Sequence, residues 1–284
     1  MGKFSNILFA SDFDHTISGP EHEVPQANIE AIRYFMSEGG LFCLNSGRSI
    51  PLLRCRVRQI PTNAPCLCYN GAACYDYATE KLLYAHTLPE FASELVELIQ
   101  GSGLNVCMEV QRFDNHYEIG RQLPSRLRFL AHEGLVPIFC NANVPRPWMK
   151  LIVCGADGES VSERAEDIAE EDLAAFIHLQ KKIEAYCAGR CYVTRSMPRL
   201  IEISNPNCNK GKAARALAKK LGRKILVCAG DAPNDEQMLR EADFAFCPMD
   251  ADVSILALEG VRHTAASNIG CIADAIHQLE GMLT

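Results

Sequence analysis

The chain has no surplus of basic residues, no long apolar run and no low-complexity segment. Its 28 Lys and Arg are outnumbered by 35 Asp and Glu, which gives a formal net charge of -7. Proteins that bind nucleic acid non-specifically need a basic face, so this charge balance argues against that class. No stretch approaches the roughly 20 apolar residues of a membrane-spanning helix. The short polar start, residues 1–6, is not typical of a secretory signal. We therefore expect a cytoplasmic protein without a nucleic-acid or membrane partner.

The 14 cysteines do not form any pair of C-x-x-C motifs. This absence argues against a structural zinc site, which usually needs two such pairs. Without an export signal the cysteines should be reduced thiols. Cys43, Cys154 and Cys228 lie in apolar runs, where a cysteine behaves as a small buried hydrophobic residue.

Short apolar runs alternate with amphipathic segments at both ends of the chain. Buried strands are predicted over 6–11, 41–48, 65–72 and 224–235, the last ending in acidic residues, and helices over 24–38 and 209–222. Apolar strands that alternate with amphipathic helices indicate a parallel sheet with helices on both faces. The two ends of the chain therefore predict an α/β, doubly wound core.

The middle of the chain has a different pattern. From about residue 86, helical segments mix with strands that alternate between apolar and polar residues, such as 104–110. This pattern is typical of an antiparallel sheet with one exposed face and helices on the other. We predict three segments: core residues 1–85, an inserted α+β cap domain over 86–203, and core residues 204–284. A helix is expected around 161–187, Trp148 is expected in the core, and Lys150 is expected as a solvated edge charge.

Unusual polar residues stand where the predicted core strands end and where one helix begins. They are Asp12 and Asp14, Ser46 and Arg48, Lys210, and Asp231 with Asn234 and Asp235. Ligands of open parallel sheets bind beyond the carboxyl ends of the strands, and a helix N-terminus favours an anion. Several carboxylates in one site would repel one another, and a hard cation such as Mg²⁺ would relieve the repulsion. Lys210 and Ser46 would then be left to bind an anion.

Four motifs in this order resemble the haloacid dehalogenase-like superfamily of phosphohydrolases. They are D-x-D-x-T over 12–16, S-G-R over 46–48, K-G at 210–211 and G-D-x-x-N-D over 230–235. The length and position of the insertion resemble the type-two (C2B) cap of the Cof subfamily. The resemblance implies a Rossmann-like core, a Mg²⁺ cofactor and a phosphatase that acts on a small phosphorylated metabolite. Residue His15 stands where the family usually has glycine.

The resemblance also implies a role for each motif residue. Asp12 would be the nucleophile, and Asp14 the general acid and base with its backbone carbonyl on the metal. Asp12 and Asp231 would be metal ligands, supported by Asp235. The phosphoryl group would be bound by the following residues: Ser46, Lys210, Asn234, and the backbone N–H groups of Phe13 and Gly47. Arg48 would either reach the substrate or pair with a core carboxylate.

The sequence leaves two alternatives to a phosphatase. One is a phosphomutase of the same superfamily, and the other is a non-catalytic sensor that binds a phosphometabolite. The intact pair Asp12 and Asp14 speaks against the sensor, since loss of the acid and base is an easy route to a binding protein. The resemblance does not select among sugar phosphates, pyridoxal phosphate and flavin mononucleotide as substrates, and the oligomeric state is not readable from the sequence.

Overall fold

The computed structural model describes residues 2–141, 143–155 and 168–283, which divide into two compact units. The core unit contains Met1–Arg48, Arg56–Tyr84 and Asn209–Thr284. The inserted unit contains Ser49–Cys55 and Ala85–Cys208. The predicted boundaries between core and cap, at 85/86 and 203/204, stay a prediction.

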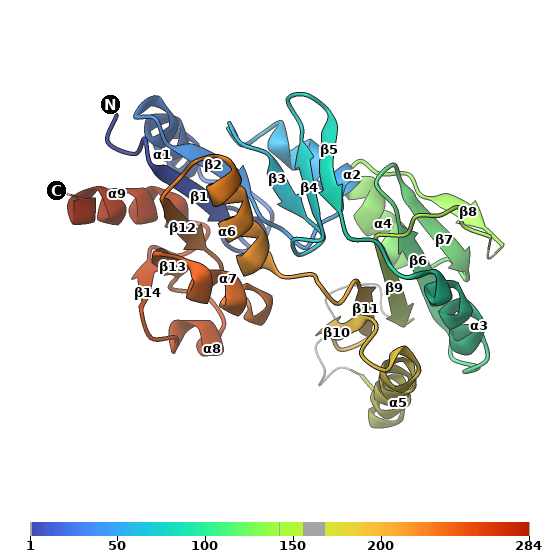
Figure 1. The fold of residues 1–284 in the computed structure, drawn as a ribbon. Coiled ribbons are helices and arrows are strands. Elements are labelled where there is room, and N and C mark those ends of the chain that lie inside the picture. The colour runs from blue at the N-terminus through green and yellow to red at the C-terminus, as the bar shows by residue number, and fades with distance from the viewer. Residues whose placement is uncertain (1, 142, 156–167, 284) are drawn as a thin grey trace. The chain divides into compact units, whose positions relative to one another are not determined.

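The core unit is built on a five-stranded parallel sheet (Figure 1). Its strands are β1 (Ile7–Ser11), β2 (Leu41–Leu44), β12 (Ile225–Ala229), β13 (Phe244–Pro248) and β14 (Val261–Thr264). Their order in the sheet is β14-β13-β12-β1-β2. β1 is buried at every residue, as expected of an interior parallel strand covered on both faces. Strand β1 lies between β12 and β2, and Asp12 follows directly at its carboxyl end.

Helices cover the core sheet. Helix α1 (Gln26–Ser37) packs on α9 (Cys271–Leu283), and α6 (Lys210–Lys220) packs on α7 (Glu236–Glu241); the two pairs flank the strands in Figure 1. Short α8 (Val253–Leu256) follows β13. The Phe9 ring packs edge-on against Phe35 of α1, with ring centroids 5.9 Å apart. The predicted doubly wound α/β class is therefore confirmed.

The segment over 65–72 differs from its prediction as a further strand of the parallel sheet. Only β3 (Cys66–Cys68) is a strand there, and it pairs antiparallel with β4 (Ala73–Asp76). With β5 (Lys81–Ala85) these strands form a separate three-stranded sheet. A single parallel bridge, Asn45 to Leu67, joins β3 to the end of β2. The Asn-Gly turn at 70–71 reverses the chain directly into β4, because Asn70 and Gly71 both have positive φ.

The inserted unit holds a six-stranded, mostly antiparallel sheet. In the order β10-β11-β9-β6-β7-β8, its strands are Tyr192–Met197, Leu200–Ser204, Lys150–Gly155, Val106–Gln111, His116–Gly120 and Ile138–Cys140. One face packs on α5 (Glu170–Cys187) and on α3 (Glu94–Gln100), which follows a 3₁₀ turn at Glu90–Ser93. Trp148 is buried in that core as expected. Residues 161–167 of the predicted helix over 161–187 lie outside the described residues, and α5 accounts for its remainder from Glu170.

Two further expectations for the inserted unit were wrong. Strand β6 is buried at all its residues instead of having one exposed face. On the second face, Arg126 of α4 (Pro124–His132) binds the β6 residue Glu109. Lys150 is 3% exposed and pairs with Glu202 at 2.7 Å, so it is not a solvated edge charge. Both errors arise because the partners come from other elements, which the local pattern does not reveal.

Helix α2 (Ile50–Val57) is shared between the two units. Its first part, through Cys55, belongs to the inserted unit, and its end belongs to the core unit. Leu52 packs in one apolar cluster with Leu130 and Leu135, with Phe129 against it.

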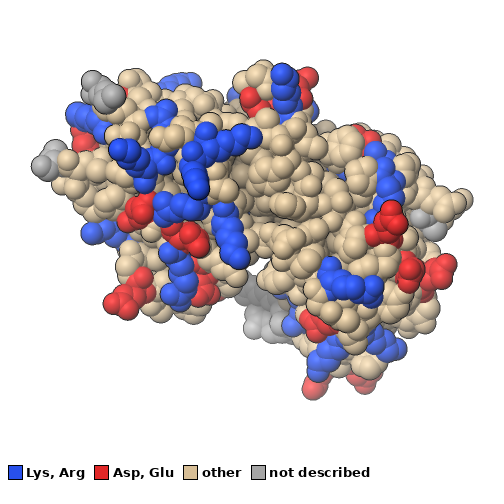
Figure 2. Space-filling view, viewed as in Figure 1, with Lys and Arg blue, Asp and Glu red and all other residues tan. Residues whose placement is uncertain are grey.

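The surface in Figure 2 carries charges of both signs. Over α6 and α7, Lys and Arg side chains are interspersed with Asp and Glu (Figure 2), and Arg215 there pairs with Asp243 at 2.9 Å. Among the helices of the described residues, none is long and apolar enough to cross a membrane.

Candidate active site

The loop after β1 is folded tightly around the carbonyl oxygen of Phe13. That oxygen accepts hydrogen bonds from the N–H groups of Thr16, Ile17 and Ser18, at 3.4, 3.0 and 3.0 Å. Asp12 N–H donates to the Ala229 carbonyl at 2.9 Å and so continues the pairing of β1 with β12. Asp12 and Asp14 consequently lie at the carboxyl end of β1, where the sheet geometry predicts a ligand site.

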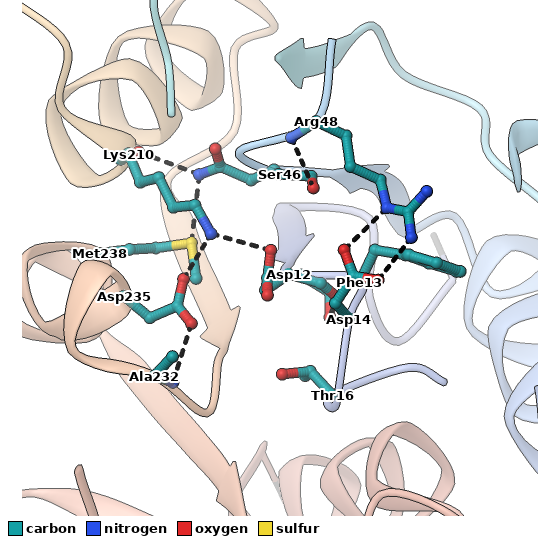
Figure 3. Close-up of polar contacts among 12 residues, drawn as sticks. Asp12, Phe13, Asp14, Thr16, Ser46, Arg48, Lys210, Ala232, Asp235 and Met238 are labelled. Carbon is teal, nitrogen blue, oxygen red and sulfur yellow. Dashed lines mark hydrogen bonds and ion pairs between the residues drawn. The ribbon is translucent and has the colours of Figure 1, made fainter. Parts of the chain in front are cut away.

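Lys210 links two of the carboxylates in the core unit (Figure 3). Its Nζ donates to Asp12 Oδ1 at 2.8 Å and to Asp235 Oδ1 at 2.6 Å, and the lysine is 2% exposed. Burial works against the ammonium, but the two carboxylates outweigh it and hold the pKa of Lys210 above its usual range. Lys210 is thus a fixed positive charge at the first turn of α6, and Asn45 Nδ2 anchors that turn by donating to the Lys210 carbonyl at 3.0 Å.

Asp231 completes a group of three acidic side chains with Asp12 and Asp235, whose ligand atoms lie within 4.8 Å of one another. Asp231 Oδ1 accepts from Thr16 Oγ1 at 2.7 Å. Burial and the neighbouring Asp235 raise the pKa of Asp231 to about 7. Burial raises the pKa of Asp12 as well, although Lys210 opposes it.

The cluster fits a divalent cation. Three carboxylates face one ammonium, so the group has an excess of negative charge when ionised. Oxygen ligands are the donors that hard cations such as Mg²⁺ prefer. Asp235 is already occupied by Lys210 and by the N–H groups of Asp231 and Ala232, at 3.1 and 3.2 Å. Asp12 and Asp231 are therefore the side chains best suited to hold the ion, with Asp235 as their support.

Asp14 lies apart from this cluster and is bound by Arg48 instead (Figure 3). Arg48 Nε and Nη2 donate to the two carboxylate oxygens, each at 2.7 Å. His22 Nδ1 lies 3.6 Å from Asp14 Oδ1. Burial disfavours the charged carboxylate, but the hydrogen bonds from Arg48 and the nearby His22 outweigh it and hold the pKa of Asp14 well below its usual range. Of the two alternatives for Arg48, the structure thus has the pair with a core carboxylate.

The remaining predicted phosphate-binding residues differ in position. Ser46 is 1% exposed, and its Oγ accepts from Arg48 N–H at 3.1 Å. A Cβ on Gly47 would lie 2.8 Å from Asn70 Oδ1, so any larger residue there would have to displace the Asn70 side chain. Phe13 is buried, with the Arg48 guanidinium 5.1 Å from its ring centroid. Asn234 is exposed in the 3₁₀ turn Pro233–Asp235.

The sequence analysis gave no role to Thr16, His22 or Asn45. Thr16 stands inside the D-x-D-x-T motif, and Asn45 directly precedes Ser46 at the end of β2, so both had a local signal. His22 had none, because it comes near Asp14 only through the fold of the loop, in which His15 and His22 both have positive φ.

Comparison with known protein families shows to which family the chain belongs. Residues 9–130 and 157–276 match the haloacid dehalogenase-like hydrolases. The chain belongs to this family. The match covers most of the chain on both sides of a gap over 131–156, so it includes every predicted site residue. The predicted resemblance is confirmed.

Curated relatives and solved structures extend this result. The HMP-PP phosphatase of Escherichia fergusonii is 24% identical over 243 residues, covering 84% of this chain and 82% of the relative. A haloacid dehalogenase-like hydrolase from Bacteroides thetaiotaomicron has a TM-score of 0.82 at 17% identity and covers 96% of this chain and 98% of its own. A subclass IIB sugar phosphatase has a TM-score of 0.75 at 18% identity, covering 96% and 98%. The likeness to these structures concerns the fold.

Proposed function

We propose that the chain is a Mg²⁺-dependent phosphatase that hydrolyses a small phosphomonoester through an aspartyl-phosphate on Asp12. The observation that supports this most directly is the different partners of its two central carboxylates. Asp12 is held by Lys210 within the acidic cluster, whereas Asp14 is held by Arg48 away from it. Two carboxylates with distinct environments can take the separate roles of nucleophile and proton carrier. The similarity to a sugar phosphatase and to an HMP-PP phosphatase supports the substrate class.

In the first step, an Asp12 carboxylate oxygen attacks phosphorus, and the bond from phosphorus to the leaving oxygen breaks. Asp14 gives its proton to that oxygen, and the alcohol leaves. In the second step, Asp14 takes a proton from water, and the resulting hydroxide attacks the phosphorus of the aspartyl-phosphate. Inorganic phosphate is released and the Asp12 carboxylate is restored.

Asp12, Asp231 and the Asp14 backbone carbonyl would hold Mg²⁺, which when bound neutralises negative charge on the carboxylates and the phosphoryl oxygens. Lys210 neutralises further charge as the phosphoryl group transfers, and Ser46, Asn234 and the backbone N–H groups of Phe13 and Gly47 donate hydrogen bonds to it. Because Arg48 favours the ionised form of Asp14, the acid step requires this pair to loosen when substrate is bound.

The cytoplasm is the proposed location, and the 14 free thiols support it. Cysteine thiols are kept reduced in the cytoplasm.

The test is turnover of ³²P-labelled p-nitrophenyl phosphate with Mg²⁺, followed by acid quench. Wild type should release inorganic phosphate and retain a transient label on the protein, while Asp12→Asn should do neither. Transfer of phosphate back to a substrate, without net release, would favour the phosphomutase. Binding of phosphometabolites without any turnover by wild type would favour the sensor.

A further inference from the structure

A buried polar cluster in the inserted unit ends on the residue next to Arg48. Ser49 Oγ lies 2.7 Å from His116 Nε2 of β7, and His116 Nδ1 lies 3.0 Å from Glu109 Oε1 of β6. Arg126 of α4 donates two hydrogen bonds to Glu109, at 2.7 and 2.8 Å. Ser49, His116 and Glu109 are each 0% exposed. The order serine, histidine, carboxylate is that of a hydrolytic triad, but no substrate reaches groups buried to this degree.

The polar groups of the cluster lie in direct contact with one another; His116 Nδ1 has the ion-pair contact with Glu109 but no hydrogen bond of good geometry. Ser49 Oγ accepts a hydrogen bond from Leu52 N–H at 3.2 Å, so Ser49 caps the start of α2. The Ser49 hydroxyl keeps its own proton, which it can donate to His116 Nε2, and the Nδ1 proton then faces Glu109. Arg126 and His116 outweigh the effect of burial and hold the pKa of Glu109 well below its usual range. Ser49 is therefore fixed to the sheet of the inserted unit by a charged and fully buried anchor.

The segment that Ser49 begins is bound to the inserted unit at a second point. Leu52 packs with Leu130 and Leu135 of the same unit. The chain on either side returns to the core unit, at Arg48 and Arg56. Both of these arginines lie over the ring of Phe13, at 5.1 and 5.5 Å from its centroid. Phe13 is the residue between Asp12 and Asp14.

The peptide bond between Arg48 and Ser49 thus joins two differently held groups. On one side, Arg48 holds Asp14 and its N–H donates to Ser46 Oγ. On the other, Ser49 is held by His116. A displacement of Ser49 is transmitted to the neighbouring Arg48, because fixed bond lengths and the planar peptide leave only two soft dihedral angles per residue.

We propose that the Ser49–His116 connection is a positioning device, through which the sheet of the inserted unit sets the position of residues 46–48 of the candidate active site. His116 and Ser49 are positioning residues that act through Ser46 and Arg48. The inference rests on the proposed function only in taking those two residues as active-site groups. A displacement of about 1 Å in such a loop can cost around 100-fold in rate, so the connection matters although it never meets the substrate.

The experiment uses the full chain and two independent readouts in Ser49→Ala, His116→Ala and the double variant. The first readout is backbone hydrogen exchange of the peptide spanning 45–53. We expect faster exchange in both single variants, with little further change in the double variant. The second readout is turnover of p-nitrophenyl phosphate, where we expect kcat to fall about 10- to 100-fold with KM nearly unchanged. His116→Gln, whose amide can still bond the Ser49 hydroxyl, should recover part of both losses.

Val153→Ala is the matched control. Val153 is buried in the apolar cluster of the inserted unit that contains Trp148, so its truncation opens a cavity there without changing a residue of the Ser49–His116 connection. It should lower stability and leave the 45–53 peptide and kcat unchanged. The proposal is overturned if that peptide exchanges at the wild-type rate in folded Ser49→Ala and His116→Ala. It is also overturned if the kcat losses match those of Val153→Ala. If wild type shows no turnover, the proposed function fails, and the exchange readout still decides whether the connection holds the loop.

Discussion

Replacing Lys210 by Met should destabilise the core unit in the absence of divalent cations and should make its stability strongly dependent on Mg²⁺. The ammonium is buried between Asp12 and Asp235, at 2.8 and 2.6 Å. Removing one partner of a buried ion pair costs about 3–5 kcal/mol, because the other partner is left uncompensated. The carboxylates also repel each other when ionised; their ligand atoms lie within 4.8 Å of one another, and at that limit one ionised pair contributes about 3.5 kcal/mol with an effective dielectric constant near 20.

The assay is urea unfolding followed by circular dichroism, in EDTA and in Mg²⁺. In EDTA we expect Lys210→Met to lose about 3–5 kcal/mol relative to wild type, or roughly 10 °C in Tm for a domain of this size. Bound Mg²⁺ at 100 times its Kd stabilises by about 2.7 kcal/mol. Its effect should be larger in Lys210→Met, where it compensates charge that the lysine no longer neutralises, so the gap between the proteins should narrow.

Lys212→Met is the control for this series. Lys212 lies on the same helix but is exposed, so its replacement should change stability by less than about 0.5 kcal/mol. If Lys210→Met were as stable as wild type in EDTA, or if Mg²⁺ stabilised both equally, the account of three carboxylates balanced by one ammonium would be refuted.

Other predictions follow from the same site. Asp12→Asn should abolish turnover with an unchanged circular dichroism spectrum, and near-normal rates would remove Asp12 from the mechanism. Asp14→Asn should slow turnover by about 10²- to 10⁴-fold in steady-state assays; a loss below tenfold would exclude it as acid and base. EDTA should stop turnover and Mg²⁺ restore it, and Asp231→Ala should raise the Mg²⁺ concentration needed for half-maximal rate. Full activity in excess EDTA would contradict the metal requirement.

The core of the fold was predictable because its signals are local. A buried parallel strand is apolar throughout, and its polar residues stand directly at its carboxyl end, as Asp12 does after β1. The carboxyl ends of neighbouring parallel strands meet at one edge of the sheet, so residues far apart in sequence, such as Asp12 and Asp231, could be assigned to one site. The family match supports that grouping, and the individual roles stay predictions.

The inserted unit was less predictable because its partners are not local. The alternation over 104–110 predicted an exposed face, but Arg126 of α4 covers Glu109 there. Lys150 forms an ion pair with Glu202 of the neighbouring strand β11. Glu202 is two residues before Ser204, the residue that stands opposite Lys150 in the strand pairing. Nothing in either segment encodes the order of the strands in the sheet. Arg48 was left between two partners for the same reason, and the structure gives it Asp14.

Glu118 provides a test of this buried face that is independent of catalysis. It stands opposite Glu109 in the pairing of β6 with β7 and is 2% exposed. Burial and the charge of Glu109 raise the pKa of Glu118 to about 7, with Arg126 opposing, from a usual value of 4.5. The folded protein thus keeps a proton that the unfolded chain loses above pH ~4.5. Stability should fall as pH rises from about 5 to 8, by up to about 3 kcal/mol for this shift.

The variant Glu118→Gln lacks this titrating proton, so its free energy of unfolding relative to wild type should rise over the same pH range. Urea unfolding at four pH values, with Mg²⁺ present to suppress titration of the acidic cluster, measures the difference. A difference that does not change with pH would show that Glu118 is ionised in the folded protein at both ends of the range.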